Sequence, residues 1–156
     1  MNSLLFMGAA IGFGLSAIIS IFTNRYRLML AVGLFSLTII SFILIFIDIS
    51  RSTFMILYFI LGVMSGTETL VFAIGRFLSP KGPSGSATAG INLINNMIPV
   101  ILLPMIWHIL IKYGHLISDS SYTYTIKSYQ SALTIIIAIL IINIPLVALL
   151  PKHTKL

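Results

Sequence analysis

Five apolar stretches, each about as long as a membrane-spanning helix, make up most of this chain and limit what it can fold into. A helix needs about 20 mainly apolar residues to cross the hydrocarbon core of a bilayer. Each stretch must be helical there, because an isolated strand would leave its backbone groups unpaired in hydrocarbon. We therefore predict one all-α membrane domain over 1–156, with five transmembrane helices at about 4–22, 28–47, 54–74, 88–111 and 132–150.

Charged residues are too few to cover the surface of a water-soluble domain. They make up 8% of the chain, against about 25% in an ordinary soluble protein. This composition excludes a compact soluble enzyme and predicts a lipid bilayer as the main partner. The nine Lys and Arg residues stand singly at the ends of apolar stretches. Because they form no basic stripe, nucleic acid is not expected as a partner.

The basic residues also predict the orientation of the chain, since cytoplasmic loops are enriched in Lys and Arg. An arrangement with the N-terminus outside and the C-terminus inside gives the larger number of basic residues to the cytoplasm. The cytoplasmic side then holds Arg25, Arg27, Arg76, Lys81, Lys152 and Lys155, and the other side holds Arg51, Lys112 and Lys127. We expect a multi-pass integral protein of a bacterial inner (plasma) membrane.

The last two connections between the predicted helices are longer than the first two. The segment 77–87 is rich in Gly, Pro and Ser, which predicts a cytoplasmic loop that is not regular helix. The segment 113–131 is expected to be a polar external loop. Its tyrosines are better explained as aromatic anchors at the membrane interface than as functional groups.

Glu68 is the only acidic residue inside a predicted span. A carboxylate in hydrocarbon costs on the order of 3 kcal/mol on insertion scales, so Glu68 should face a cavity or a partner, or be protonated. It could bind a proton or a substrate on a transport pathway. It could instead lie close enough to the cytoplasmic interface to reach water, beside Arg76.

Three amides share one face of the helix predicted over 88–111. Asn92, Asn95 and Asn96 are spaced at i, i+3 and i+4, and Pro99 follows at i+7. Such a face should turn toward the interior of the bundle or toward water. It could hydrogen-bond a substrate, or it could simply join neighbouring helices. Pro99 and Pro104 each remove a helix hydrogen bond and predict a kink.

Gly8 and Gly12 give the first predicted helix a small-xxx-small pattern. Small residues at this spacing let two helix backbones approach closely. Packing inside the bundle is favoured over a dimer interface. In the last predicted helix, Asn143 and Pro145 are interpreted as a local kink.

The sequence contains a pattern that resembles a protease motif, but its context argues against catalysis. Gly82-Pro83-Ser84-Gly85 matches the G-x-S-G of intramembrane serine proteases. The only histidine inside a span, His108, lies 24 residues further along the same helix, about 36 Å away at 1.5 Å per residue. A nucleophile and its base must be within hydrogen-bonding distance. There is also no cysteine, and we expect neither enzyme activity nor a metal or cofactor.

The order of these features resembles the last five helices, eight to twelve, of a major facilitator superfamily transporter. The glycine pattern of 8–14 (GAAIGFG) leads into a short basic turn that contains Asn24, Arg25 and Arg27. The family has a cytoplasmic signature turn at this place, which reads roughly G-x-x-S-D-R-x-G-R-R. Asn24 stands where the family usually has an acid.

The resemblance continues through the rest of the chain. The segment 62–73 (GVMSGTETLVFA) is similar to helix ten of the family, and a loop with proline follows it in both. The segment 86–92 (SATAGIN) resembles the entry into helix eleven. The segment 128–133 (SYQSAL) resembles the start of helix twelve.

The family resemblance implies secondary active transport of a small solute by alternating access between two six-helix halves. The transport would be coupled to protons or other ions, and Glu68, Asn92 and Asn96 would line the pathway. The chain would then be a truncated or split part that works with the missing N-terminal helices. The alternative is a small non-transporting membrane protein that binds a partner through the face of Gly8 and Gly12.

Overall fold

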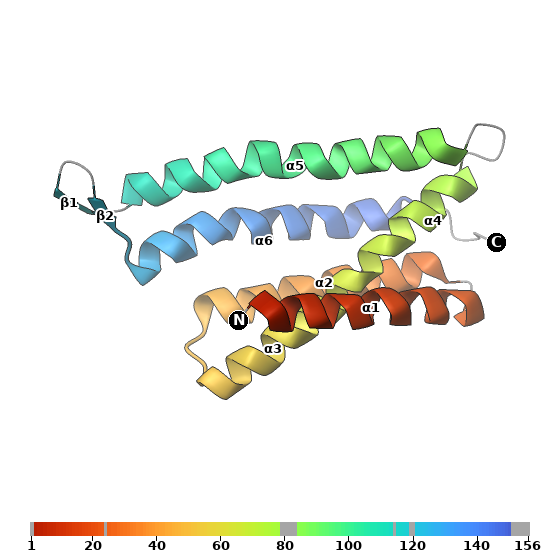
Figure 1. Cartoon of the computed structure of the whole chain (residues 1–156), viewed down its shortest axis with the longest axis horizontal. Helices are drawn as coiled ribbons and strands as arrows, with labels where there is room; N and C mark the ends of the chain where they lie inside the picture. Colours follow the sequence, from red (N-terminus) through yellow and green to blue (C-terminus); the bar gives the residue numbers. More distant parts are fainter. Residues whose placement is uncertain (1, 24, 79–83, 114, 119–120, 151–156) are drawn as a thin grey trace.

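The computed structural model describes residues 2–23, 25–78, 84–113, 115–118 and 121–150. Helices dominate the described part of the chain, and a short antiparallel hairpin follows α5 (Figure 1). The elements are α1 (Asn2–Thr23), α2 (Tyr26–Phe46), α3 (Arg51–Ser65), the 3-10 turn η1 (Gly66–Glu68), α4 (Thr69–Leu78), α5 (Ser84–Tyr113), β1 (His115–Ser118), β2 (Ser121–Thr123) and α6 (Ile126–Ala148).

Five helical segments in the described residues are long and apolar enough to cross a membrane, which confirms the prediction of five such helices. The segments are Asn2–Phe22, Tyr26–Phe46, Arg51–Arg76, Gly85–Tyr113 and Ile126–Ala148. Large apolar side chains are exposed along their outer faces, as a lipid environment requires. The chain is an integral, multi-pass membrane protein.

Successive spans run in opposite directions, so the connections alternate between the two ends of the bundle (Figure 1). The C-terminal end of α1, the start of α2, the C-terminal end of α4, the start of α5 and the C-terminal end of α6 lie at one end. Arg25, Arg27 and Arg76 belong to this end, and Arg51 and Lys112 belong to the other. This arrangement brings together Arg25, Arg27 and Arg76, three of the six basic residues that the sequence analysis assigned to one side, while Lys81, Lys152 and Lys155 lie outside the described residues.

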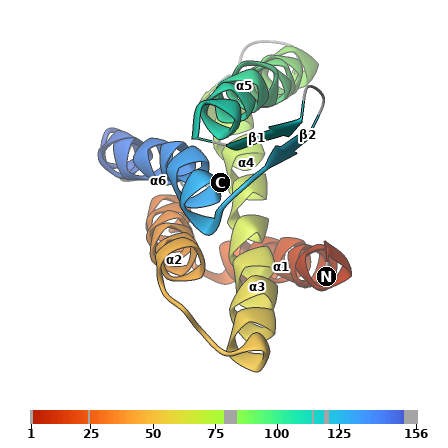
Figure 2. The same ribbon diagram turned by 90° about the vertical axis from the view of Figure 1, so that its left-hand side faces the viewer.

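The third span is the central element of the bundle. It runs obliquely between the other helices, with α1 on one side and α2 on the other (Figure 2). Its segments contact α1 and α2, and α4 also contacts α5, whereas α6 packs against α2 and α5.

The single helix predicted over 54–74 is present within the span Arg51–Arg76, but its regular α-helical pattern is interrupted near the middle. The 3-10 turn η1 separates α3 from α4. Three hydroxyl groups around it donate to carbonyls three residues earlier: Ser65 Oγ to Gly62 at 2.6 Å, Thr67 Oγ1 to Met64 at 2.8 Å and Thr69 Oγ1 to Gly66 at 2.9 Å. Such bonds compete with the helix pattern and bend it. A run of Ser, Gly and Thr also has low helix propensity, so the break has a local cause.

The α1 helix packs against the broken span through glycines on both sides of the contact. A Cβ atom added at Gly8 would collide with the carbonyl oxygen of Phe59, and one added at Gly12 would collide with the carbonyl oxygen of Val63. On the opposite side, a Cβ at Gly66 would collide with the backbone of Gly12. The two backbones are therefore in direct contact, as small-xxx-small patterns permit.

A hydrogen bond extends this contact beyond the glycines. The Ser16 hydroxyl is buried on α1 and lies 2.9 Å from the Gly66 carbonyl oxygen, to which it donates. It also lies 3.0 Å from the Thr69 hydroxyl. On the other side of η1, a Cβ at Gly33 of α2 would collide with Thr67. The turn η1 is thus held between α1 and α2.

The α6 helix begins at Ile126, earlier than the predicted start at 132, because Thr125 caps it. The Thr125 hydroxyl accepts a hydrogen bond from the Ser128 amide at 3.3 Å. The Ser128 hydroxyl donates to the carbonyl of Tyr113 at 2.7 Å, and Gln130 donates to the carbonyl of Ile45 at 2.9 Å. Part of the segment predicted as an external loop is therefore the beginning of α6, and two of its side chains hydrogen-bond to Tyr113 at the end of α5 and to Ile45 of α2.

The predicted loop over 77–87 is also shorter than expected. The α4 helix continues to Leu78, and α5 begins at Ser84. Residues 79–83 lie outside the described part of the chain. The α5 helix then continues without interruption past Pro99 and Pro104.

Candidate functional site

Glu68 ends the 3-10 turn, where the central span changes from α3 to α4. The amide nitrogen Nδ2 of Asn95, on α5, donates to Glu68 Oε1 at 3.0 Å. These two residues were predicted separately from the sequence, and the structure brings them together from different helices. The hydrogen bond connects η1 to α5.

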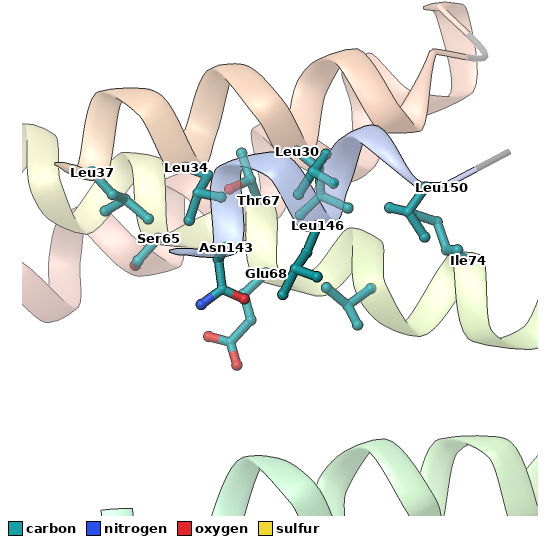
Figure 3. A pocket seen from close by; sticks show the side chains of 12 residues that line it. Leu30, Leu34, Leu37, Ser65, Thr67, Glu68, Ile74, Asn143, Leu146 and Leu150 are labelled. Carbon is teal, nitrogen blue, oxygen red and sulfur yellow. The ribbon is translucent and has the colours of Figure 1, made fainter. Parts of the chain in front are cut away.

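Glu68, an exposed residue, is among those that line a cavity of about 420 Å³. The cavity is formed by α2, the broken central span and the second half of α6. Most of the wall is aliphatic, and the polar lining residues are Ser65, Thr67, Glu68 and Asn143. Figure 3 shows the side chains of Glu68 and Asn143 pointing the same way, toward the side on which α5 runs. This is a mainly apolar site with a few polar groups, the usual composition of a small-molecule pocket.

Glu68 belongs to the membrane part of the chain. It precedes Arg76 by eight residues, which is ~12 Å along a helix with a rise of 1.5 Å per residue. Arg76 is exposed on α4 and does not line the cavity. The structure therefore places Glu68 beside Asn95 and the cavity rather than beside Arg76.

Asn143 is one of the polar lining residues that sequence reasoning missed as site residues, together with Ser65 and Thr67. Its Nδ2 donates to the Ile139 carbonyl of its own helix at 2.8 Å, and its side chain lines the cavity with Glu68. One signal was present, because Asn143 is the only amide in the span predicted over 132–150. Its assignment to the cavity required the packing of α6 beside α2.

The other two amides of α5 are placed differently from Asn95. Asn92 and Asn96 are both exposed, and Asn96 Nδ2 donates to the Asn92 carbonyl at 2.8 Å. Neither lines the cavity beside Glu68. Of the three amides on this face of α5, Asn95 therefore contacts Glu68, and Asn92 and Asn96 are exposed.

The basic turn is described only in part. Asn24 lies outside the described residues. Arg25 is exposed immediately before α2, its carbonyl accepts from the Met29 amide at 3.1 Å, and Arg27 is half-buried in the first turn of α2. Gly8 and Gly12 lie in the α1–α3 contact described above.

The remaining candidate residues give no further site. His108 is exposed on α5, while Gly82 and Pro83 of the protease-like pattern lie outside the described residues. Within the described ranges, no group of three or more His, Asp or Glu side chains is placed to hold a metal ion.

Comparison of the chain with known protein families, with curated proteins and with solved structures found no match. The site itself is therefore the basis for a functional assignment. It combines a membrane-embedded carboxylate, two amides from α5 and α6, and an apolar cavity at a break in a helix. Such an arrangement can bind a small solute or a proton within the membrane.

Proposed function

We propose that this chain forms part of a secondary active transporter for a small solute, which binds in the cavity beside Glu68. The observation that carries the proposal is the Asn95–Glu68 hydrogen bond at the wall of this cavity, at the break in the central span. Transporters place solute and ion sites between membrane helices near the middle of the bilayer. The resemblance of the sequence to the last five helices of a major facilitator superfamily transporter leads to the same proposal.

Glu68 is proposed to be the residue that couples transport to an ion or a proton. Ionisable residues within membrane spans are costly and mark substrate or ion pathways. Asn92 and Asn96 support a larger assembly, because two exposed amides on α5 would be costly against lipid. We propose that this face of α5 adjoins further helices or a water-filled pathway.

The alternative function, a non-transporting protein that binds a partner through its glycine face, has less support. That face of α1 is already in contact with the backbone of α3 and η1. A partner would have to displace the broken span to reach Gly8 and Gly12. We therefore prefer transport.

The proposed orientation places the N-terminus outside and the C-terminus in the cytoplasm. The end of the bundle with Arg25, Arg27 and Arg76 would face the cytoplasm, as the distribution of basic residues favours.

The test of transport uses membrane vesicles from the native host, in which any additional helices are supplied. A strain without the gene is complemented with the wild-type chain, with Glu68→Gln or with Asp48→Asn. Asp48 is a matched control, because it is an exposed acid between α2 and α3, away from the cavity. Uptake of labelled sugars, amino acids, nucleosides and organic ions is measured with and without a proton gradient.

We expect at least one solute whose uptake requires the gene. Its uptake should fall about tenfold or more in Glu68→Gln and remain unchanged in Asp48→Asn. Absence of any gene-dependent uptake would contradict the proposed function. Uptake that is gene-dependent but unchanged in Glu68→Gln would remove Glu68 from the mechanism.

A further inference from the structure

The wall of the cavity restricts the chemistry of the molecule that it can hold. Its aliphatic residues come from three helical segments, and no Lys, Arg or His of the described residues lines it. Among the described residues of the wall, Glu68 is the one that carries a charge. The aliphatic lining residues are Leu30, Leu34, Leu37, Val71, Ile74, Leu146, Val147 and Leu150.

The hydrogen bonding of Glu68 leaves the carboxylate able to accept more donors. A carboxylate has about four acceptor positions, and Asn95 donates to one oxygen, Oε1. The Asn95 amide is neutral, so it contributes a hydrogen bond but does not balance the negative charge. A charge in an apolar surrounding is stabilised by an opposite charge.

We infer that the ligand of this cavity is an amphipathic organic monocation, with an apolar body against the aliphatic wall and its positive charge beside Glu68. This inference rests on the proposed function, since it names the class of solute for the same site. A neutral apolar solute would leave the carboxylate without a countercharge. An organic anion would be repelled by Glu68, because no basic side chain in the described part of the wall offsets its charge.

A strongly hydrated inorganic cation fits the wall less well. Divalent cations such as Ca²⁺ take six to eight oxygen ligands, and Mg²⁺ takes six. The polar lining groups are the two hydroxyls of Ser65 and Thr67, the Glu68 carboxylate and the Asn143 amide. An organic cation instead retains apolar groups around its charge, and these groups gain from contact with aliphatic side chains.

Binding of two ions of equal shape and opposite charge tests the inference. The full chain is reconstituted in nanodiscs of zwitterionic lipid, and binding of labelled tetraphenylphosphonium or tetraphenylborate is measured. Empty nanodiscs give the amount that partitions into lipid. Three variants are compared with the wild-type chain. Glu68→Gln removes the charge and retains an oxygen acceptor for Asn95, whereas Val71→Trp fills the cavity and retains the carboxylate. Asp48→Asn is the control.

We expect saturable binding of tetraphenylphosphonium to the wild-type chain and to Asp48→Asn. The dissociation constant should rise at least about tenfold in Glu68→Gln and in Val71→Trp. Tetraphenylborate should bind no more than it binds empty nanodiscs. Equal binding of the two ions, or unchanged cation binding in Glu68→Gln, would overturn the inference.

A second measurement keeps Glu68 in place and does not depend on the folding of these variants. Ser65 lines the cavity, and the chain has no cysteine, so Ser65→Cys provides a single reactive thiol. Tetraphenylphosphonium should slow the reaction of this thiol with a maleimide at least about threefold, and tetraphenylborate should not. Equal rates with and without the cation would contradict the inference.

The ligand-binding experiment and the transport experiment can succeed or fail independently of each other. Glu68-dependent binding of the cation without any gene-dependent uptake would contradict transport and retain the ligand class. Glu68-dependent uptake of a neutral or anionic solute, without cation binding, would retain transport and overturn the ligand class.

Discussion

Replacement of Gly12 by Ala tests whether the direct backbone contact between α1 and the broken span holds the bundle together. A Cβ atom at Gly12 would meet three backbone atoms of Val63: the carbonyl oxygen, the carbonyl carbon at 2.8 Å and Cα at 2.9 Å. Backbone atoms cannot move aside as a side chain can, so the helices must separate. Gly14, on the same helix, is the matched control, because a Cβ there meets nothing within 4 Å.

The expected magnitude follows from the difference between the two variants. Replacement of Gly by Ala in a helix stabilises it by about 1 kcal/mol, and both variants share this gain. Insertion of a methyl group into a filled contact costs about 1–3 kcal/mol, which applies to Gly12 only. Because the collision is with backbone, we expect the free energy of unfolding of Gly12→Ala to be about 2–3 kcal/mol below that of Gly14→Ala. This corresponds to a ratio of about 30–150 in the folding equilibrium constant.

The assay is reversible unfolding in mixed micelles with increasing SDS. Ser3 on α1 and Ser52 on α3 are exposed, and in this cysteine-free chain they can be replaced by cysteines that carry a donor and an acceptor dye. Energy transfer between the dyes falls when α1 leaves α3. The midpoint in SDS and the free energy of unfolding are compared for the parent, Gly12→Ala and Gly14→Ala proteins.

Equal midpoints for Gly12→Ala and Gly14→Ala would refute the reasoning. They would mean that α1 does not contact the Val63 backbone closely enough to exclude one methyl group. A Gly14→Ala protein less stable than the parent would show that α1 has a contact on its exposed face.

Three further outcomes are expected. Ser16→Ala should lower the free energy of unfolding in SDS by about 0.6 kcal/mol, because Thr69 still donates to the Gly66 carbonyl; a loss above about 2 kcal/mol would contradict this. Ala132 is fully buried on α6, so Ala132→Leu should destabilise the protein by about 1–3 kcal/mol in the same titration, and an unchanged midpoint would refute its burial. In intact cells, an impermeant maleimide should label Ser52→Cys and not Gly85→Cys; the reverse pattern would invert the proposed orientation.

The length and composition of the apolar stretches were sufficient to predict five membrane-spanning helices. A span needs only enough consecutive apolar residues to cross hydrocarbon, and its backbone must then satisfy its own hydrogen bonds. The helix ends were harder to predict, because they depend on individual caps. The side chain of Thr125, for example, starts α6 before the apolar stretch begins.

The sequence contains a signal for the 3-10 turn η1, but the prediction of one helix over 54–74 did not use it. Ser65, Gly66 and Thr67 lie within an otherwise apolar stretch, and hydropathy alone treats such a stretch as one helix. The hydroxyl bonds to earlier carbonyls show why this segment departs from regular α-helix.

Residue chemistry by itself determined that Glu68 needs a polar surrounding in the membrane and that Gly8 and Gly12 permit a close approach of another helix. Only the tertiary structure decided which residues meet them. Asn95, rather than Asn92 or Asn96, reaches Glu68 from a helix 27 positions further along the chain, and the backbone of α3 and η1 fills the glycine face. The physical reason is that periodicity assigns a residue to a face of its own helix, whereas the packing of helices distant in sequence determines what that face contacts.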